Sequence, residues 1–150
     1  RAEIANRVFG SQGDVTLRTR LTEEIIFPRT GQELRAKIED FRTRAGPLDV
    51  LVVDAPTLFE SRRGDWCDQI LLVTAPLETR RIWASTRGWD AGEMDRRDAA
   101  MIPEEEKRRC AAHVINNAGS LQDLVSAVDQ LWSRLRGFDP SSPRVPSQEN

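Results

Sequence analysis

The stretch DVLVVDAPTLFE, residues 49–60, decides the fold class. Its residues 50–53 are four consecutive branched apolar side chains without polar alternation, which is typical of an inner strand buried on both faces of a parallel sheet. Asp54 follows at the carboxyl end of this predicted strand, where open α/β sheets bind their ligands. Pro56 cannot donate to a strand ladder and directs the chain out of the sheet. Asp54 is therefore a candidate site residue, and a solvated carboxylate at a strand end is an equally good interpretation.

Further apolar runs predict two more strands, at residues 69–74 and 113–117. Helices are predicted between them, at residues 78–87 and about 91–100, with another that begins at Pro103. Ser120 and Asp123 have the spacing of a capping box, which starts a last helix. The predicted core face of that helix consists of Leu121, Leu124, Val125, Val128, Leu131, Trp132 and Leu135. Strands that alternate with helices predict a three-layer α/β domain with right-handed crossovers.

The first part of the chain is predicted to be helical. Apolar spacing indicates helices at residues 1–9, at about 15–26 and at about 30–44, and Pro28 is expected to break the second from the third. At the other end, residues 139–150 are rich in Ser and Pro and are expected to be disordered.

Composition narrows the function classes. A chain of 150 residues with 39% hydrophobic and 31% charged residues predicts one soluble globular domain. The net charge of −2 gives no reason to expect a nucleic-acid partner, and no apolar stretch approaches membrane-spanning length. Cys67 and Cys110 form neither a metal-type spacing nor a disulfide framework, so we expect two reduced thiols. A cytoplasmic protein that binds neither nucleic acid nor membrane is the resulting expectation. We also expect a monomer, although composition does not determine the oligomeric state.

The positions of the two lysines in the sequence exclude one common type of phosphate-binding loop. A phosphate-binding loop of the form GxxxxGK(S/T) needs a lysine followed by Ser or Thr. The chain has only Lys37, followed by Ile38, and Lys107, followed by Arg108. These 150 residues therefore contain no such loop.

Arginines form the second candidate site. They lie on two predicted helices that are joined by residues 88–92, where Gly88 and Gly92 allow a hinge. Arginines on a mobile flap suit charge stabilisation of a transferring phosphoryl group. From charge alone, an ordinary solvated helix face is the interpretation favoured. The set is Arg80, Arg81, Arg87, Arg96 and Arg97.

Four segments follow one another along the chain: residues 54–60, residues 75–79 with Arg87, residues 97–107 and residues 114–120. In this order they resemble motifs of the dephospho-coenzyme A kinase family of P-loop kinases. The first resembles the family's PLLFE segment and the second its strand-to-lid helix. Residues 97–107, RDAAMIPEEEK, and residues 114–120, VINNAGS, resemble two later family motifs. The similarity extends from about residue 1 to residue 135.

The resemblance implies a P-loop-kinase-like fold that transfers phosphate from ATP, with Mg²⁺, to the 3′-hydroxyl of dephospho-coenzyme A. It implies that Arg87 and Arg97 are catalytic lid residues that contact the ATP phosphates. It also implies a magnesium role for Asp54, through the ion's hydration shell. The remaining implied roles are substrate binding by Pro28, Leu58, Phe59 and Glu60, and nucleotide binding near the adenine by Asn117 and Gly119.

Departures from the family pattern modify this expectation. The family's first strand, its lysine-bearing phosphate loop and the aspartate thought to act as base have no counterpart here. Phe27, Trp83, Met101 and Ala112 replace residues usual in the family, namely histidine, arginine, glutamine and aspartate. We therefore expect residues 1–138 to be the carboxyl-terminal part of a kinase whose central strand lies outside this sequence, inactive as it stands. Residues 1–46 would be its helical substrate region and residues 88–102 its lid.

Two other functions stay open. The chain could be a non-catalytic module that has kept affinity for nucleotide or coenzyme A. It could also be another nucleotide or nucleoside kinase of the same layered fold, distinguished by the acceptor that it binds.

Overall fold

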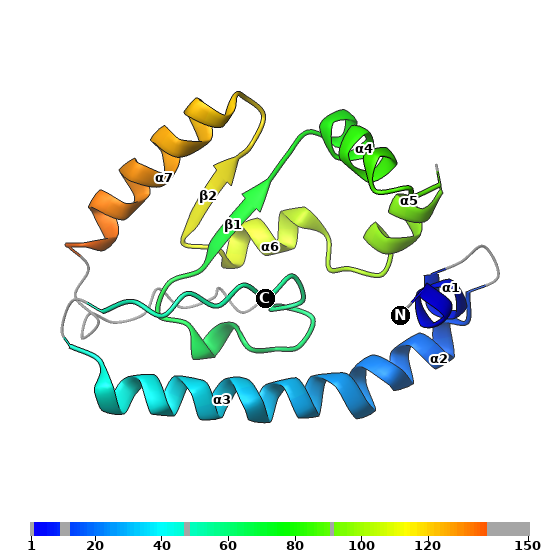
Figure 1. Ribbon diagram of the computed structural model, residues 1–150, viewed down its shortest axis with the longest axis horizontal. Helices are drawn as coiled ribbons and strands as arrows, with labels where there is room; N and C mark the ends of the chain where they lie inside the picture. The colour runs from blue at the N-terminus through cyan, green and yellow to red at the C-terminus, as the bar shows by residue number, and fades with distance from the viewer. Residues whose placement is uncertain (1, 10–12, 47–48, 91, 138–150) are drawn as a thin grey trace. The chain divides into compact units, whose positions relative to one another are not determined.

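The computed structural model describes residues 2–9, 13–46, 49–90 and 92–137 (Figure 1). The chain divides into two compact units, residues 1–61 and residues 62–150, and each is described separately. The predicted disordered tail, residues 139–150, lies outside the described residues.

The first unit is helical, as predicted, but Pro28 does not separate two helices. Helix α1 (Ala2–Phe9) precedes an unbroken helical run of α2 (Val15–Arg20), a π-helical turn (Leu21–Ile26) and α3 (Phe27–Arg44). Pro28 lies in the first turn of α3. Val8 and Ile38 are the buried apolar side chains of this unit among the residues described.

The π-helical turn explains why the predicted break at Pro28 is wrong. A proline inside an α-helix lacks a donor and clashes with the carbonyl group four residues earlier. Here the Phe27 N–H donates to Thr22 O, five residues earlier, so the turn is wider at the point where the ring enters. The Thr30 hydroxyl also donates to Ile26 O at 2.8 Å. The helix thus continues through the proline.

Residues 50–53 form no strand, so the predicted inner strand is not found in the described chain. The Val52 side chain is 80% exposed. The chain then folds into a turn over residues 55–61, in which Leu58 N donates to Ala55 O and Ser61 N to Thr57 O. A strand exists only where a second backbone accepts and donates along it, and an apolar run by itself does not provide that partner.

The second unit contains the predicted parallel sheet. Strands β1 (Leu71–Thr74) and β2 (His113–Asn116) pair in parallel, with Leu71 opposite His113 and Thr74 opposite Asn116 (Figure 1). The connection between them runs through α4 (Leu77–Thr86), α5 (Glu93–Asp98) and α6 (Glu104–Cys110). This arrangement confirms the α/β class, two of the predicted strands and the helices between them.

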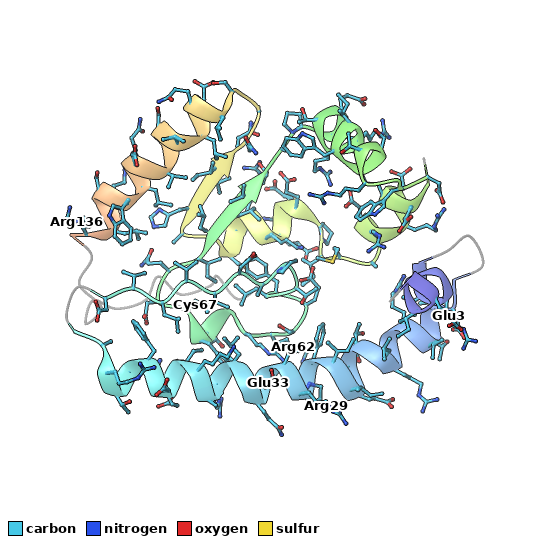
Figure 2. All side chains as sticks on the ribbon, viewed as in Figure 1. Glu3, Arg29, Glu33, Arg62, Cys67 and Arg136 are labelled. Carbon is cyan, nitrogen blue, oxygen red and sulfur yellow. The ribbon has the colours of Figure 1, made fainter. Side chains whose placement is uncertain are left out.

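Helix α7 (Leu121–Leu135) begins at the predicted capping box and ends at Arg136 (Figure 2). The Asp123 carboxylate accepts from the Ser120 backbone N–H at 2.8 Å, and the Asp123 N–H donates to the Ser120 hydroxyl at 3.3 Å. Reciprocal bonds of this kind satisfy donors that a helix start would otherwise leave unpaired.

The predicted core face of α7 is wrong in one respect, because no residue of this helix is buried. Leu121 is 76% exposed and Trp132 is 45% exposed. The buried apolar side chains described in this unit are those of Ala84, Met94 and Ile115 instead. Helical spacing shows which side of a helix is apolar, and what covers that side depends on the tertiary structure. None of the described helices is long and apolar enough to cross a membrane.

Candidate functional site

A cavity of about 520 Å³ in the second unit lies beside the carboxyl end of β1. Thr74 and Ala75 form its edge at the strand end, and α4, α5 and the start of α6 supply the other walls. Figure 2 shows side chains of α4 and α5 converging beyond the end of β1. This is the edge of a parallel sheet at which α/β proteins bind ligands.

Helix α4 presents one stripe of side chains to the cavity. Arg80, Trp83, Ala84 and Arg87 all line it, at positions i, i+3, i+4 and i+7. These positions lie on one face of an α-helix. The stripe therefore places two guanidinium groups and an indole ring on the same wall.

Positive charge exceeds negative charge at the cavity wall. The cationic side chains that line it are Arg80, Arg87 and Lys107, and the carboxylates are Asp98 and Glu104. Glu104 is engaged with Arg108, whose Nη2 lies 2.8 Å from its Oε1. The cavity is therefore suited to an anionic ligand more than to a cationic one.

Arg87 is the arginine of the predicted set that has no counter-ion among the described residues. Its side chain is exposed, and no hydrogen bond or ion pair joins it to any described group. Its neighbours are paired: Arg81 with Glu78, Arg96 with Asp90 and Arg97 with Glu93, at N–O distances of 3.0, 2.9 and 2.6 Å. An unpaired guanidinium at the cavity wall is available to an anion.

Backbone geometry fixes the place of Arg87 at the end of α4. Gly88, the next residue, has a φ of +76°. Its backbone N–H donates to Ser85 O at 3.0 Å, and the backbone N–H of Trp89 donates to Ala84 O at 3.2 Å. This pair of bonds is a Schellman motif, which needs a residue in the left-handed region. Glycine adopts that region without strain.

Arg97 has a different environment from Arg87. Its guanidinium lies 4.3 Å from the centre of the Trp89 ring and 2.6 Å from Glu93 Oε1. Trp89 lines the cavity, whereas Arg97 does not. The structure thus places Arg87 and not Arg97 at the cavity wall, and the catalytic role of both stays a prediction.

The predicted hinge, residues 88–92, contains a bonded carboxylate. The Gly92 backbone N–H donates to Asp90 Oδ1 at 2.8 Å, and the Arg96 guanidinium lies 2.9 Å from Asp90 Oδ2. These two donors, the backbone N–H first, lower the pKa of Asp90. The bonds tie the joint to the start of α5.

Asn117 and Gly119 follow β2 at the same end of the sheet as the cavity. The Asn117 N–H donates to Thr74 O at 2.7 Å, which joins the ends of the two strands. A Cβ atom on Gly119 would lie 2.6 Å from the Asp123 carboxylate oxygen and 3.1 Å from Asp123 Cβ. Gly119 therefore has a structural function in the capping box, and its predicted place near an adenine stays a prediction.

The other predicted site residues belong to the first unit. Pro28 lies in α3, Asp54 is exposed, and residues 58–60 are half-buried in the turn of residues 55–61. No group of three or more His, Cys, Asp or Glu side chains in the described chain could hold a metal ion. Mg²⁺ often takes only one or two carboxylates together with water and substrate phosphates, so a single Asp54 carboxylate is compatible with it.

Among the charged and aromatic side chains that line the cavity, sequence reasoning missed those of Trp89, Asp98, Glu104 and Lys107. The spacing of Arg80, Trp83 and Arg87 in the sequence already indicated that these three residues share one face of α4. No local pattern links Asp98 to Arg80, because the two residues lie on different helices.

A parallel α/β unit with a cationic cavity at its strand ends is typical of proteins that bind phosphorylated ligands. Comparison with known proteins specifies the class: residues 1–123 match the model of the dephospho-CoA kinase family. The chain belongs to this family.

Individual relatives agree with the family match. A dephospho-CoA kinase of Corynebacterium diphtheriae is 34% identical over 136 residues, which cover 90% of this chain and 65% of the relative. One of Deinococcus radiodurans is 37% identical over 136 residues, 90% of this chain and 63% of the relative. One of Rhodopirellula baltica is 29% identical over 129 residues, 86% of this chain and 59% of the relative. The chain thus spans about six tenths of the length of these relatives.

Proposed function

We propose that the protein transfers the terminal phosphate of ATP to the 3′-hydroxyl of dephospho-coenzyme A, in the cytoplasm and as a monomer. The family match over residues 1–123 carries this proposal. The cavity beside β1, with Arg87 unpaired at its wall, supports it because phosphoryl transfer depends on neutralising the charge of the phosphate oxygens.

The proposed roles rest on the family resemblance and, for Arg87 and Arg97, also on the surroundings of their side chains. Arg87 binds phosphate oxygens directly, while Arg97 orients Trp89, a cavity-lining residue, through the contact of its guanidinium group with the indole ring. Asn117 and Gly119 lie near the adenine. Pro28 and residues 58–60 bind the dephospho-coenzyme A side of the reaction.

Mg²⁺ would neutralise charge on the phosphate oxygens of ATP when bound. Asp54 is the residue we propose to hold its hydration shell. The Asp54 carboxylate is exposed and accepts no hydrogen bond from a described group, so it is available to water molecules of the ion.

The 150 residues do not supply all the groups that transfer requires. They contain no lysine-bearing phosphate loop. Such loops surround the phosphates with backbone N–H groups, and losing one preorganised donor already costs about 10²–10³ in rate. We propose that turnover needs a phosphate loop from outside this sequence. The strand that precedes this loop would join the parallel sheet and complete a three-layer α/β domain. The exposure of Val52 and Val73, 80% and 56%, supports an apolar partner for these segments.

A second candidate function is a binding module without turnover. The substitutions at Trp83, Met101 and Ala112 favour it, because each replaces a residue that the family resemblance leads us to expect. This module would keep affinity for nucleotide or coenzyme A.

Calorimetry separates the two functions. ATP and dephospho-coenzyme A are titrated into the 150-residue chain and into a version joined at residue 1 to a strand and a GxxxxGK(S/T) loop. Phosphoryl transfer by the joined version alone supports the kinase. Equal binding by both versions without transfer supports the binding module, and transfer to a different nucleoside acceptor identifies another kinase of this fold.

A further inference from the structure

The cavity wall contains a second guanidinium whose chemistry the proposed function does not use. Arg80 lies on the same face of α4 as Arg87, two helical turns earlier. The rise of an α-helix places the two residues about 10 Å apart along its axis. Two long cationic side chains at this spacing can contact one extended polyphosphate.

Arg80 is only partly satisfied by the groups around it. Its Nη1 lies 2.7 Å from Asp98 Oδ2 on α5. Its Nε atom is buried and has no acceptor among the described residues. An arginine has five N–H donors in a planar arrangement, and an unsatisfied buried donor costs free energy that a suitable acceptor would recover.

Asp98 occupies the place that an anionic oxygen would take. It lines the same cavity as Arg80, and its carboxylate is a planar acceptor with two oxygens. A phosphate group offers the same geometry with more charge, because guanidinium groups bind carboxylate and phosphate by similar bidentate bonds. Arg80 can therefore exchange one anion for the other.

We propose that Arg80 is a second phosphate-binding residue of this cavity and that phosphate oxygens displace Asp98 from it. The ligand class is a polyphosphate, free or as part of a nucleotide, contacted by Arg80 and Arg87 together. The identity of the polyphosphate as that of ATP rests on the proposed function, but the binding itself does not.

Binding of inorganic tripolyphosphate to the 150-residue chain tests the proposal, by calorimetry or by the fluorescence of Trp83 and Trp89 at the cavity wall. Arg80→Gln should weaken binding about tenfold to a hundredfold, as expected for the loss of a hydrogen bond to a charged group. Arg81→Gln is the matched control, because Arg81 is on the same helix, pairs with Glu78 and does not line the cavity. It should stay within about twofold of the unaltered chain.

A second variant excludes a purely structural explanation. If Arg80 acted only by tying α5 to α4, Asp98→Asn would remove the same ion pair and would weaken binding as much as Arg80→Gln. Our proposal predicts that Asp98→Asn binds tripolyphosphate as tightly as the unaltered chain, or a few times tighter, since a competing negative charge is gone. Thermal unfolding of all three variants confirms that each is folded.

The results have distinct meanings. Equal losses in Arg80→Gln and Asp98→Asn, an unchanged Arg80→Gln, or no binding by the unaltered chain would each overturn the proposal. None of these results contradicts phosphoryl transfer by the kinase. Conversely, the expected pattern of tripolyphosphate binding stands even if no transfer to dephospho-coenzyme A is found.

Discussion

The guanidinium carbon of Arg97 lies 4.3 Å from the centre of the Trp89 ring, while its Nε and Nη2 atoms both donate to Glu93 Oε1. The Arg97 side chain is 28% exposed, so much of this contact is removed from water. The three side chains join the end of α4 to α5. Trp89 lines the cavity and Arg97 does not, so an effect of Arg97 on the cavity would have to pass through the indole ring.

Replacing Trp89 should therefore destabilise the second unit in proportion to the lost ring interaction. A cation–π contact contributes about 0.5–2 kcal/mol and is strongest for tryptophan. We expect Trp89→Leu to lower the free energy of unfolding by about 1–2 kcal/mol beyond the loss in Trp89→Phe, which keeps a ring. Urea denaturation followed by circular dichroism measures the difference. Equal free energies of unfolding for Trp89→Leu and Trp89→Phe would show that the contact between the ring face and Arg97 does not stabilise the fold.

Replacing Gly88 with alanine should destabilise the chain. Its φ of +76° lies in the left-handed region, which costs an L-residue about 1–2 kcal/mol. No atom lies within 4 Å of a Cβ built there, so this backbone strain is the whole expected cost of Gly88→Ala. Gly137→Ala is the control, since its Cβ would make an ordinary contact of 3.7 Å with Arg134 O. Thermal unfolding should show a loss for Gly88→Ala and little change for Gly137→Ala.

Acid should weaken the start of α7 through Asp123. Bonds from the Ser120 side chain and backbone lower the pKa of Asp123 in the folded state. A lowered pKa means that the unfolded chain binds the proton first, so the stabilisation is present above the unfolded value of about 3.9 and is lost as the pH falls through the folded pKa. Asp123→Asn should remove this part of the pH dependence.

Unfolding of both proteins between pH 7 and pH 2.5 measures that effect. The difference in stability between the unaltered chain and Asp123→Asn should be constant above pH 5 and should shrink in more acidic solution. A difference that does not change with pH would mean that the carboxylate charge has no function in the cap.

Arg87 should be important for transfer in the version joined to a phosphate loop. Its guanidinium is unpaired among the described residues and lines the cavity, so removing its charge leaves developing phosphate charge uncompensated. We expect Arg87→Gln to lower kcat about 10²–10³-fold, the effect typical of one preorganised donor. Arg81→Gln should leave kcat within about twofold, because exposed helix ion pairs contribute little. A smaller loss in Arg87→Gln than in Arg97→Gln would reverse the roles that we assign to these two residues.

Local chemistry along the sequence was sufficient to determine much of the second unit. The apolar runs at β1 and β2, the proline before α6 and the capping box of Ser120 and Asp123 all lie where the sequence predicts them. Each of these features depends on residues within one turn or one strand of each other. Local preference and final structure therefore agree.

The tertiary structure decided what depends on partners from elsewhere in the chain. Residues 50–53 have strand composition but no strand, because strand formation needs a second backbone. The helix continues through Pro28 because residues 21–26, which precede it, form a π-helical turn. The helix propensity of proline does not predict this turn. The ion pair of Arg80 and Asp98 joins residues eighteen positions apart on two helices. The two charges meet at the cavity wall only in the folded chain. Their spacing in the sequence does not predict this contact.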